Sequence, residues 1–230
     1  MKNIRNIAAA AAASVLMAVP AFAIDTVTFA QYAQQSSNNS VQYANTGTGN
    51  TLTIAQAPVF FVVTDFGPVG VYPALLSLSA SSSAMVTSNG PLFEQTGWSG
   101  TMSFTNAATN YLTVNFINAT FSFDASGGSA SLISTDPSNP ISFTSTLLNL
   151  PAFVEENFSL AFTSITPPFS VASNGYGNAF VASTAGSFAG SDGIDDAGIP
   201  EPASWAMMLA GFGLVGVTAR RRSGKTVVAA

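Results

Sequence analysis

The side chains that could do chemistry between residues 24 and 199 are carboxylates, hydroxyls and aromatic rings, because this interval contains no His, Cys, Lys or Arg. A Ser-His-Asp triad, a cysteine nucleophile, a lysine Schiff base and a zinc site with nitrogen or sulfur ligands are therefore excluded there. A pair of carboxylates could still hydrolyse a glycosidic bond. The candidate pairs are Glu155 with Glu156, and Asp124 with Asp136. The spacing selects neither pair, and we expect solvated surface acids and no enzyme.

Two further stretches contain groups that could bind a ligand. Residues 192–196 read Asp-Gly-Ile-Asp-Asp, which offers hard oxygen ligands for Ca²⁺ but lacks the spacing and the terminal glutamate of an EF-hand loop. We therefore predict a Gly-rich acidic linker there, with no metal and no cofactor. Trp98 lies between Gly97 and Ser99 in a turn-like setting, where an exposed ring could stack on a sugar. Aromatic rings in β-proteins are more often buried, so we expect Trp98 to be a core residue, with sugar stacking as the alternative.

Charge is distributed unevenly along the chain. All six basic residues lie within residues 1–5 and 220–225, so residues 24–199 combine ten acids with no base and carry a formal charge of −10. These acids are Asp25, Asp65, Glu94, Asp124, Asp136, Glu155, Glu156, Asp192, Asp195 and Asp196. Nucleic-acid binding is excluded, since no cation is present to neutralise phosphates. The low charge density and the abundance of Ser, Thr, Asn and Gly predict a surface of hydroxyls and amides.

The stretch 199–222 combines a proline-flanked acid, an apolar run and a basic cluster. It begins Ile199-Pro200-Glu201-Pro202-Ala203-Ser204-Trp205-Ala206 and ends Arg220-Arg221-Arg222. Residues 203–219 carry no charge, and as a helix they would span about 25 Å, which predicts a transmembrane helix. The arginines resist translocation, so we expect residues 223–230 to be a cytoplasmic tail and the bulk of the chain to face outward.

The order of these features resembles the PEP-CTERM sorting signal in its PEPxxWA form. The residues that carry the resemblance are Pro200, Glu201, Pro202, Trp205, Ala206, Gly211, Gly213, Arg220, Arg221 and Arg222. The resemblance implies recognition by an exosortase, a membrane-embedded cysteine transpeptidase, with cleavage near the Pro-Glu-Pro tripeptide. It also implies a Gram-negative cell that makes exopolysaccharide, with the mature protein at the cell surface or released from it. A plain stop-transfer anchor in the inner membrane is the alternative.

Residues 1–23 are a predicted signal peptide. Lys2 and Arg5 form a positive n-region, residues 7–19 are an apolar h-region too short to span a membrane, and Ala21-Phe22-Ala23 is a small-x-small cleavage site. We therefore expect export through the Sec translocon and cleavage by signal peptidase, with Ala21 and Ala23 as the small residues of the cleavage site. The mature chain would begin at Ile24.

Strand patterns cover most of the exported body. Apolar residues alternate with Ser, Thr or Asn, or form short apolar runs, at residues 51–54, 59–63, 76–80, 101–105, 111–124, 129–133, 141–147, 158–165, 169–172 and 179–184. Turn signals such as Asn89-Gly90-Pro91 separate them. We predict one all-β domain over residues 24–185, an antiparallel β-sandwich or jelly roll. Residues 31–39 would be an irregular arm, and residues 186–198 a Gly/Ser/Asp linker.

The segment 111–124 carries the clearest alternation and a change of its phase. The apolar positions are first Leu112, Val114 and Phe116, and after Ile117 they become Ala119, Phe121 and Phe123. A shift of one residue predicts a β-bulge or turn near Asn118.

Together these features predict an exported, non-catalytic surface or matrix protein that is associated with exopolysaccharide. A carbohydrate-binding module is the alternative, and ice binding is a less favoured one because no regular Thr-x-Thr ladder is visible. A carboxylate-dependent glycosidase is more remote. Sorting tails of this kind occur on many different exported domains, so the tail does not indicate what the domain of this chain binds. Open strand edges also predict self-association.

Overall fold

The computed structural model describes residues 26–36, 38–89, 92–134 and 140–191, which fall in one compact unit, Asp25–Ile194. These residues form eleven strands and no helix. The strands are β1 (Val27–Gln34), β2 (Val41–Asn45), β3 (Asn50–Val63), β4 (Gly70–Ser82), β5 (Thr87–Asn89), β6 (Leu92–Asn106), β7 (Thr109–Phe123), β8 (Ala130–Ser134), β9 (Ile141–Thr144), β10 (Glu155–Thr166) and β11 (Phe180–Ser191). Among the residues described, none belongs to a helix able to cross a membrane, and the predicted helix 203–219 lies outside them.

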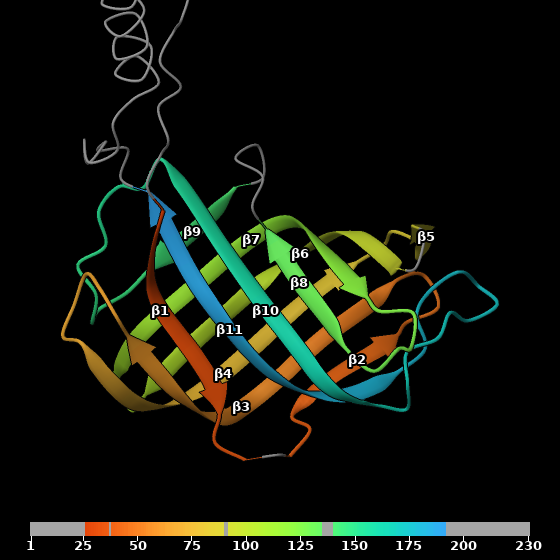
Figure 1. Cartoon of the computed structure of the whole chain (residues 1–230), viewed down its shortest axis with the longest axis horizontal. Helices are drawn as coiled ribbons and strands as arrows, with labels where there is room; N and C mark the ends of the chain where they lie inside the picture. The colour runs from red at the N-terminus through yellow and green to blue at the C-terminus, as the bar shows by residue number, and fades with distance from the viewer. Residues whose placement is uncertain (1–25, 37, 90–91, 135–139, 192–230) are drawn as a thin grey trace, which may run out of the picture. The chain divides into compact units, whose positions relative to one another are not determined.

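Eight of the strands close into an antiparallel barrel. Each of β1, β3, β4, β6, β7, β8, β10 and β11 pairs with the next in that order, and β11 pairs with β1 to close the ring. Figure 1 shows β1, β11 and β10 side by side on the near wall, with β4, β6 and β7 behind them. The all-β, antiparallel part of the prediction is confirmed, but a closed barrel replaces the sandwich or jelly roll. Period-two alternation in the sequence indicates a half-buried strand, but it does not show which strands pair. It therefore cannot distinguish a sandwich from a closed barrel.

Two positions of the barrel wall are each shared by two short strands. Between β3 and β11, β1 pairs with residues 59–63 of β3, while β2 pairs with residues 50–54 of the same strand. Along β7, β8 pairs with residues 120–123 and β9 with residues 113–116. The segment 31–39, predicted as an irregular arm, therefore contains half of β1. Its Gln-rich sequence conceals the alternation in which Ala30 and Tyr32 are buried and Gln31 is exposed. Phe29 is also buried, at a register shift between Thr28 and Ala30.

Aromatic side chains fill the barrel interior. The largest side chains with almost no exposed surface include Phe29, Tyr43, Phe61, Trp98, Phe104, Phe116, Phe121, Phe123, Phe158, Phe162 and Phe188. Loops close both ends of this core. In one, the ring of Phe153 stacks on Phe29 at 5.5 Å, and in the other Phe169 stacks on Phe123 at 3.6 Å. The barrel thus contains its own hydrophobic core, so the unit has what it needs to fold independently.

The predicted phase change in β7 is confirmed. Asn118 has a φ of 61°, and the β6–β7 register shifts on both sides of Trp98, opposite this position. Leu112 and Phe116 are buried before the shift and Phe121 after it. One predicted strand is wrong, because residues 169–172 contribute only an isolated bridge between Val171 and Gly177.

The predicted linker begins too early, because residues 186–191 belong to β11. They pair with β1 on one side and β10 on the other. The glycines there serve close packing: a Cβ on Gly186 would lie 2.7 Å from Leu160, and one on Gly190 would lie 2.5 Å from Phe153. Glycine lets a neighbouring side chain approach the backbone, and composition alone does not distinguish this use from flexibility.

Candidate functional site

The carboxylate pair Glu155 and Glu156 does not have the arrangement of an acid and a base that face each other. The two residues are consecutive on β10, and successive side chains of a strand point to opposite faces. Burial raises the pKa of the Glu156 carboxyl, and the backbone N–H of Phe143 partly offsets this by donating to it. The strands β9 and β10 are not paired by backbone hydrogen bonds. The Glu156 carboxyl therefore accepts a hydrogen bond from a β9 backbone N–H that has no strand partner on that side.

Asp124 is engaged in a turn. Its carboxylate accepts hydrogen bonds from the hydroxyls of Ser126 (2.7 Å) and Ser129 (2.5 Å) and from the N–H of Gly128 (3.2 Å). These donors, Ser129 first, lower the pKa of Asp124 to about 2. A carboxylate held ionised in this way is poorly suited to donate a proton. Its proposed partner, Asp136, lies outside the described residues.

Trp98 is a core residue, as its type favoured, and its ring is not available to stack on a sugar. It has no exposed surface, and its ring packs 5.8 Å from Tyr43 and 5.6 Å from Phe121. Gly97, with a φ of 71°, and the adjacent register shifts explain why a turn-like sequence lies within a strand. The glycines mark bulges of β6 that turn the indole inward.

Several predicted site residues lie outside the described part of the chain. These are the acidic stretch 192–196, the signal-peptide residues Ala21 and Ala23, and the sorting residues between Pro200 and Arg222. Within the described ranges, no group of three or more acidic, His or Cys side chains is placed to hold a metal ion.

The barrel wall carries an array of hydrogen-bonding side chains that we call the hydroxyl face. One row crosses five strands in register, each residue being the Cα partner of the next: Thr53, Ser79, Thr101, Asn115 and Ser142. Two flanking rows consist of Ser77, Ser103, Thr113 and Thr144, and of Thr51, Ser81 and Ser99. Neighbouring strands are about 4.8 Å apart, so the rows form a regular grid of hydroxyls and amides.

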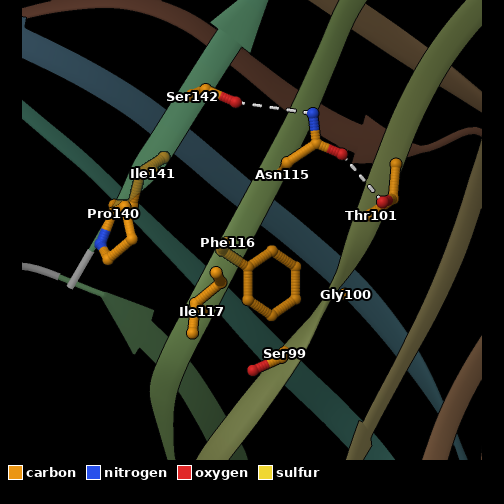
Figure 2. Close-up of a pocket in the computed structure, with 9 residues that line it drawn as sticks. All are labelled: Ser99, Gly100, Thr101, Asn115, Phe116, Ile117, Pro140, Ile141 and Ser142. Atoms are coloured by element: carbon orange, nitrogen blue, oxygen red, sulfur yellow. Dashed lines mark hydrogen bonds between the residues drawn. The ribbon is translucent and has the colours of Figure 1, made fainter.

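A shallow groove of about 450 Å³ lies at the β6–β7–β9 end of this face. Figure 2 shows its polar side, where Thr101 donates to the Asn115 side-chain oxygen (2.8 Å) and the Asn115 amide donates to Ser142 (3.4 Å). Ile117, which is 54% exposed, and Pro140 form the apolar side. The described residues that line the groove therefore combine hydroxyl and amide groups with a small apolar surface, and none of these lining residues is charged.

The hydroxyl face could not be located from the sequence, although its composition was expected. Alternation places Thr101 and Ser103 outward on one strand, but their alignment with Asn115 and Ser142 depends on the register between strands. Residues that face outward at separations of 14 and 27 positions carry no local signal of that alignment.

Comparison with known proteins identifies the tail. A family model, the PEP-CTERM protein-sorting motif, matches residues 198–222. This range contains every residue on which the resemblance was based. The motif implies export, C-terminal membrane-anchored sorting in a Gram-negative bacterium and processing by an exosortase-type membrane enzyme. No curated protein and no solved structure matches the chain.

Proposed function

We propose that this chain is a non-catalytic surface protein that is sorted by an exosortase and associates with a neutral exopolysaccharide through its hydroxyl face. The matched motif supports the sorting step. The observation that carries the polysaccharide step is the row from Thr53 to Ser142, five hydrogen-bonding side chains in register on five strands.

The chemistry of the hydroxyl face suits a neutral sugar polymer. Ser and Thr hydroxyls both donate and accept hydrogen bonds, and the Asn amide does the same, as do the hydroxyl groups of a sugar. An anionic polymer would meet acids on the exported body and no cation to pair with. We therefore expect discrimination between polysaccharides by charge. Ice binding has less support, because the rows mix Ser, Thr and Asn.

The carboxylates support a non-catalytic role. Glycoside hydrolysis needs two carboxyl groups facing one bond, one of them protonated and the other ionised. Asp124 is held in a turn, and the adjacent Glu155 and Glu156 project from opposite faces of a strand. The glycosidase alternative predicts that replacing a catalytic acid abolishes sugar release. It is contradicted if the wild type releases no more sugar than a blank, or if sugar release is unchanged when each acid is replaced in turn.

Affinity electrophoresis tests the polysaccharide step. The domain 24–199 is run through native gels containing the neutral exopolysaccharide of the producing cells, and through gels containing alginate as an anionic comparison. We expect the neutral polymer to retard the wild type, and salt up to about 0.5 M to leave this retardation unchanged, because no ion pair is formed.

The variant Thr101→Val with Asn115→Leu should run through the gel without retardation. Thr163→Val, which alters an exposed residue of β10, is the control. Equal retardation of all three proteins would place binding elsewhere, and retardation only by alginate would contradict the proposal.

A further inference from the structure

A second surface on the same barrel is apolar. On the halves of β3 and β4 beyond the hydroxyl face, the outward residues form three cross-strand pairs: Pro58 with Leu75, Phe60 with Pro73, and Val62 with Val71. We call these six residues the apolar wall. Phe60 is 46% exposed, Val71 62% and Leu75 39%. A contiguous exposed apolar patch on a soluble domain typically marks an interaction site.

The apolar wall is separated from the hydroxyl face by a defined break in β3. The β3–β4 register shifts between Ile54 and Ala57, and Gln56 there has a φ of 50°. On one side of this bulge the outward residues of β3 include Thr51 and Thr53, and on the other side they are apolar. One strand pair thus carries two surfaces of different chemistry.

Charge restricts what can cover the apolar wall. None of its six residues is charged, and the nearest acid along the chain is Asp65, in the loop that follows β3. The exported body has no cation, so it cannot pair with an acidic partner or an anionic lipid surface. Two copies of the body, both negative, repel each other least where each surface lacks acids. The apolar wall meets that condition and also supplies a hydrophobic driving force.

We infer that the apolar wall binds the apolar wall of a second copy of this chain. A twofold axis lying in the interface and perpendicular to the strands places Phe60 against Phe60 of the second copy, and Val71 against its Leu75. This axis also places the two Asp65 residues at opposite ends of the contact. An axis along the strands would bring them together. The contact is isologous, as in most homodimers.

The dimer has a consequence for the proposed function. The rows on β6, β7 and β9 lie beyond the apolar wall, so each dimer presents two hydroxyl faces. Such a dimer would cross-link two polysaccharide chains, a step that rests on the proposed function. The pairing itself does not depend on polysaccharide binding. Because the wall consists of six residues, the contact is smaller than a standard interface and we expect weak, concentration-dependent association.

Sedimentation equilibrium of the domain 24–199 without polysaccharide tests the pairing separately. Across about a hundredfold range of concentration, the wild-type mass should rise from that of a monomer toward that of a dimer. Phe60→Ser removes an anchor from both sides of the interface and should lower the association constant at least about tenfold. Thr163→Val, an exposed change on β10 that lies in neither the apolar wall nor the hydroxyl face, is the control and should leave association unchanged. A wild type that stays monomeric throughout would overturn the inference.

A charge pair tests the orientation. Val71→Lys alone and Leu75→Glu alone should each be monomeric, because each buries an unpaired charge in the contact. Their equimolar mixture should form a heterodimer, because the twofold axis brings these two positions together. Failure of the mixture to associate while the wild type dimerises would overturn this geometry. Flotation with phosphatidylcholine vesicles provides a further test: Phe60-dependent binding of a monomer would make lipid the occupant and contradict the inference.

Discussion

Gln95 is a fully buried amide whose partners come from three other segments of the chain. Its side-chain oxygen accepts from the Tyr43 hydroxyl (2.8 Å), and its nitrogen donates to Asn50 Oδ1 (3.0 Å) and to the carbonyl of Ala84 (2.7 Å). Asn50 in turn donates to the carbonyl of Gly177 and accepts from its N–H. The amide therefore joins β2, β3 and β6 to the loop before β11, and satisfied buried networks of this kind specify a unique arrangement.

We predict that Gln95→Leu destabilises the domain by about 2–4 kcal/mol, because it leaves the buried Tyr43 hydroxyl without its acceptor. Urea unfolding followed by tryptophan fluorescence measures the change, since Trp98 lies in the same core. Gln42→Leu, at an exposed glutamine of β2, is the control and should change stability little. A similar loss in both variants would show that the network contributes nothing specific.

Asp124 gives a prediction about pH. Its pKa falls from 3.8 to about 2 on folding, so the folded state favours the ionised carboxylate. This contribution to stability is complete above about pH 4 and is lost as the pH falls toward 2. Asp124→Asn should therefore lower the urea midpoint near pH 5, and the difference from wild type should shrink toward pH 2. Asp65→Asn, in another exposed loop, controls for the loss of one negative charge. A difference that is constant across this range would contradict the assigned role.

At the same scale, the sequence predicted residue types better than residue environments. The exclusion of His, Cys and Lys chemistry needs only the composition. The burial of Trp98 depends on bulges at Gly97 and near Asn118 that act across two strands. The turn at Asp124 contains a Ser-Gly-Gly sequence that is typical of a turn, but the hydrogen bonds of its carboxylate depend on the positions of Ser126 and Ser129 in the folded chain.

Strand β11 is the element on which composition misled most. Its second half reads Gly-Ser-Phe-Ala-Gly-Ser, which is typical of a linker, yet it closes the barrel against β1. The distinction depends on what lies opposite each glycine. At Gly186 the neighbours are Leu160, the carbonyl of Ser159 and the ring of Tyr32, all within 2.8 Å of where a Cβ would lie.

We predict that Gly186→Ala destabilises the domain by about 1–3 kcal/mol, because the added methyl group has no room and one neighbour is backbone. Gly128→Ala is the control, since its nearest neighbour is the end of a serine side chain at 3.3 Å. Chemical denaturation of the two variants measures the difference. If residues 186–191 formed a linker, Gly186→Ala would be neutral or slightly stabilising.

Most strands could be predicted from the local alternation of apolar and polar residues, whereas the closure of the sheet into a barrel could not. The alternation in β7 even located a bulge to within a residue. The pairing of β1 with β11 joins segments more than 150 residues apart, such as Tyr32 with Gly186, and depends on the curvature of every strand between them. Closure also alters the basis for self-association, because a barrel leaves few open strand edges. The apolar wall replaces them as the surface for contact between copies.

On the scale of the whole molecule, charge and processing are linked. The six basic residues lie in the two targeting segments, so removal of both would leave a body with acids alone. Such a body cannot bind anionic polymers by ion pairing, and its described surface offers hydroxyls, amides and one apolar wall. The chemistry of the mature protein would therefore be set by the two cleavage events as well as by the fold.

The sorting step predicts a specific fate for the tail. In native cells, the intact mass of the mature protein should correspond to a chain that begins at Ile24 and ends near Pro200. Replacing Pro200-Glu201-Pro202 by alanines should remove the cleavage site, so the variant should keep Ala230 and stay in the inner-membrane fraction. Intact-mass spectrometry of fractionated cells measures both properties, and Asn178→Ala, an exposed change in the barrel domain, controls for effects of mutation on export. If wild type and variant both retain Ala230 in the inner membrane, the tail acts as a plain anchor. The hydroxyl face would then stay at the inner membrane, where it could not reach exopolysaccharide outside the cell, and the proposed association would be contradicted.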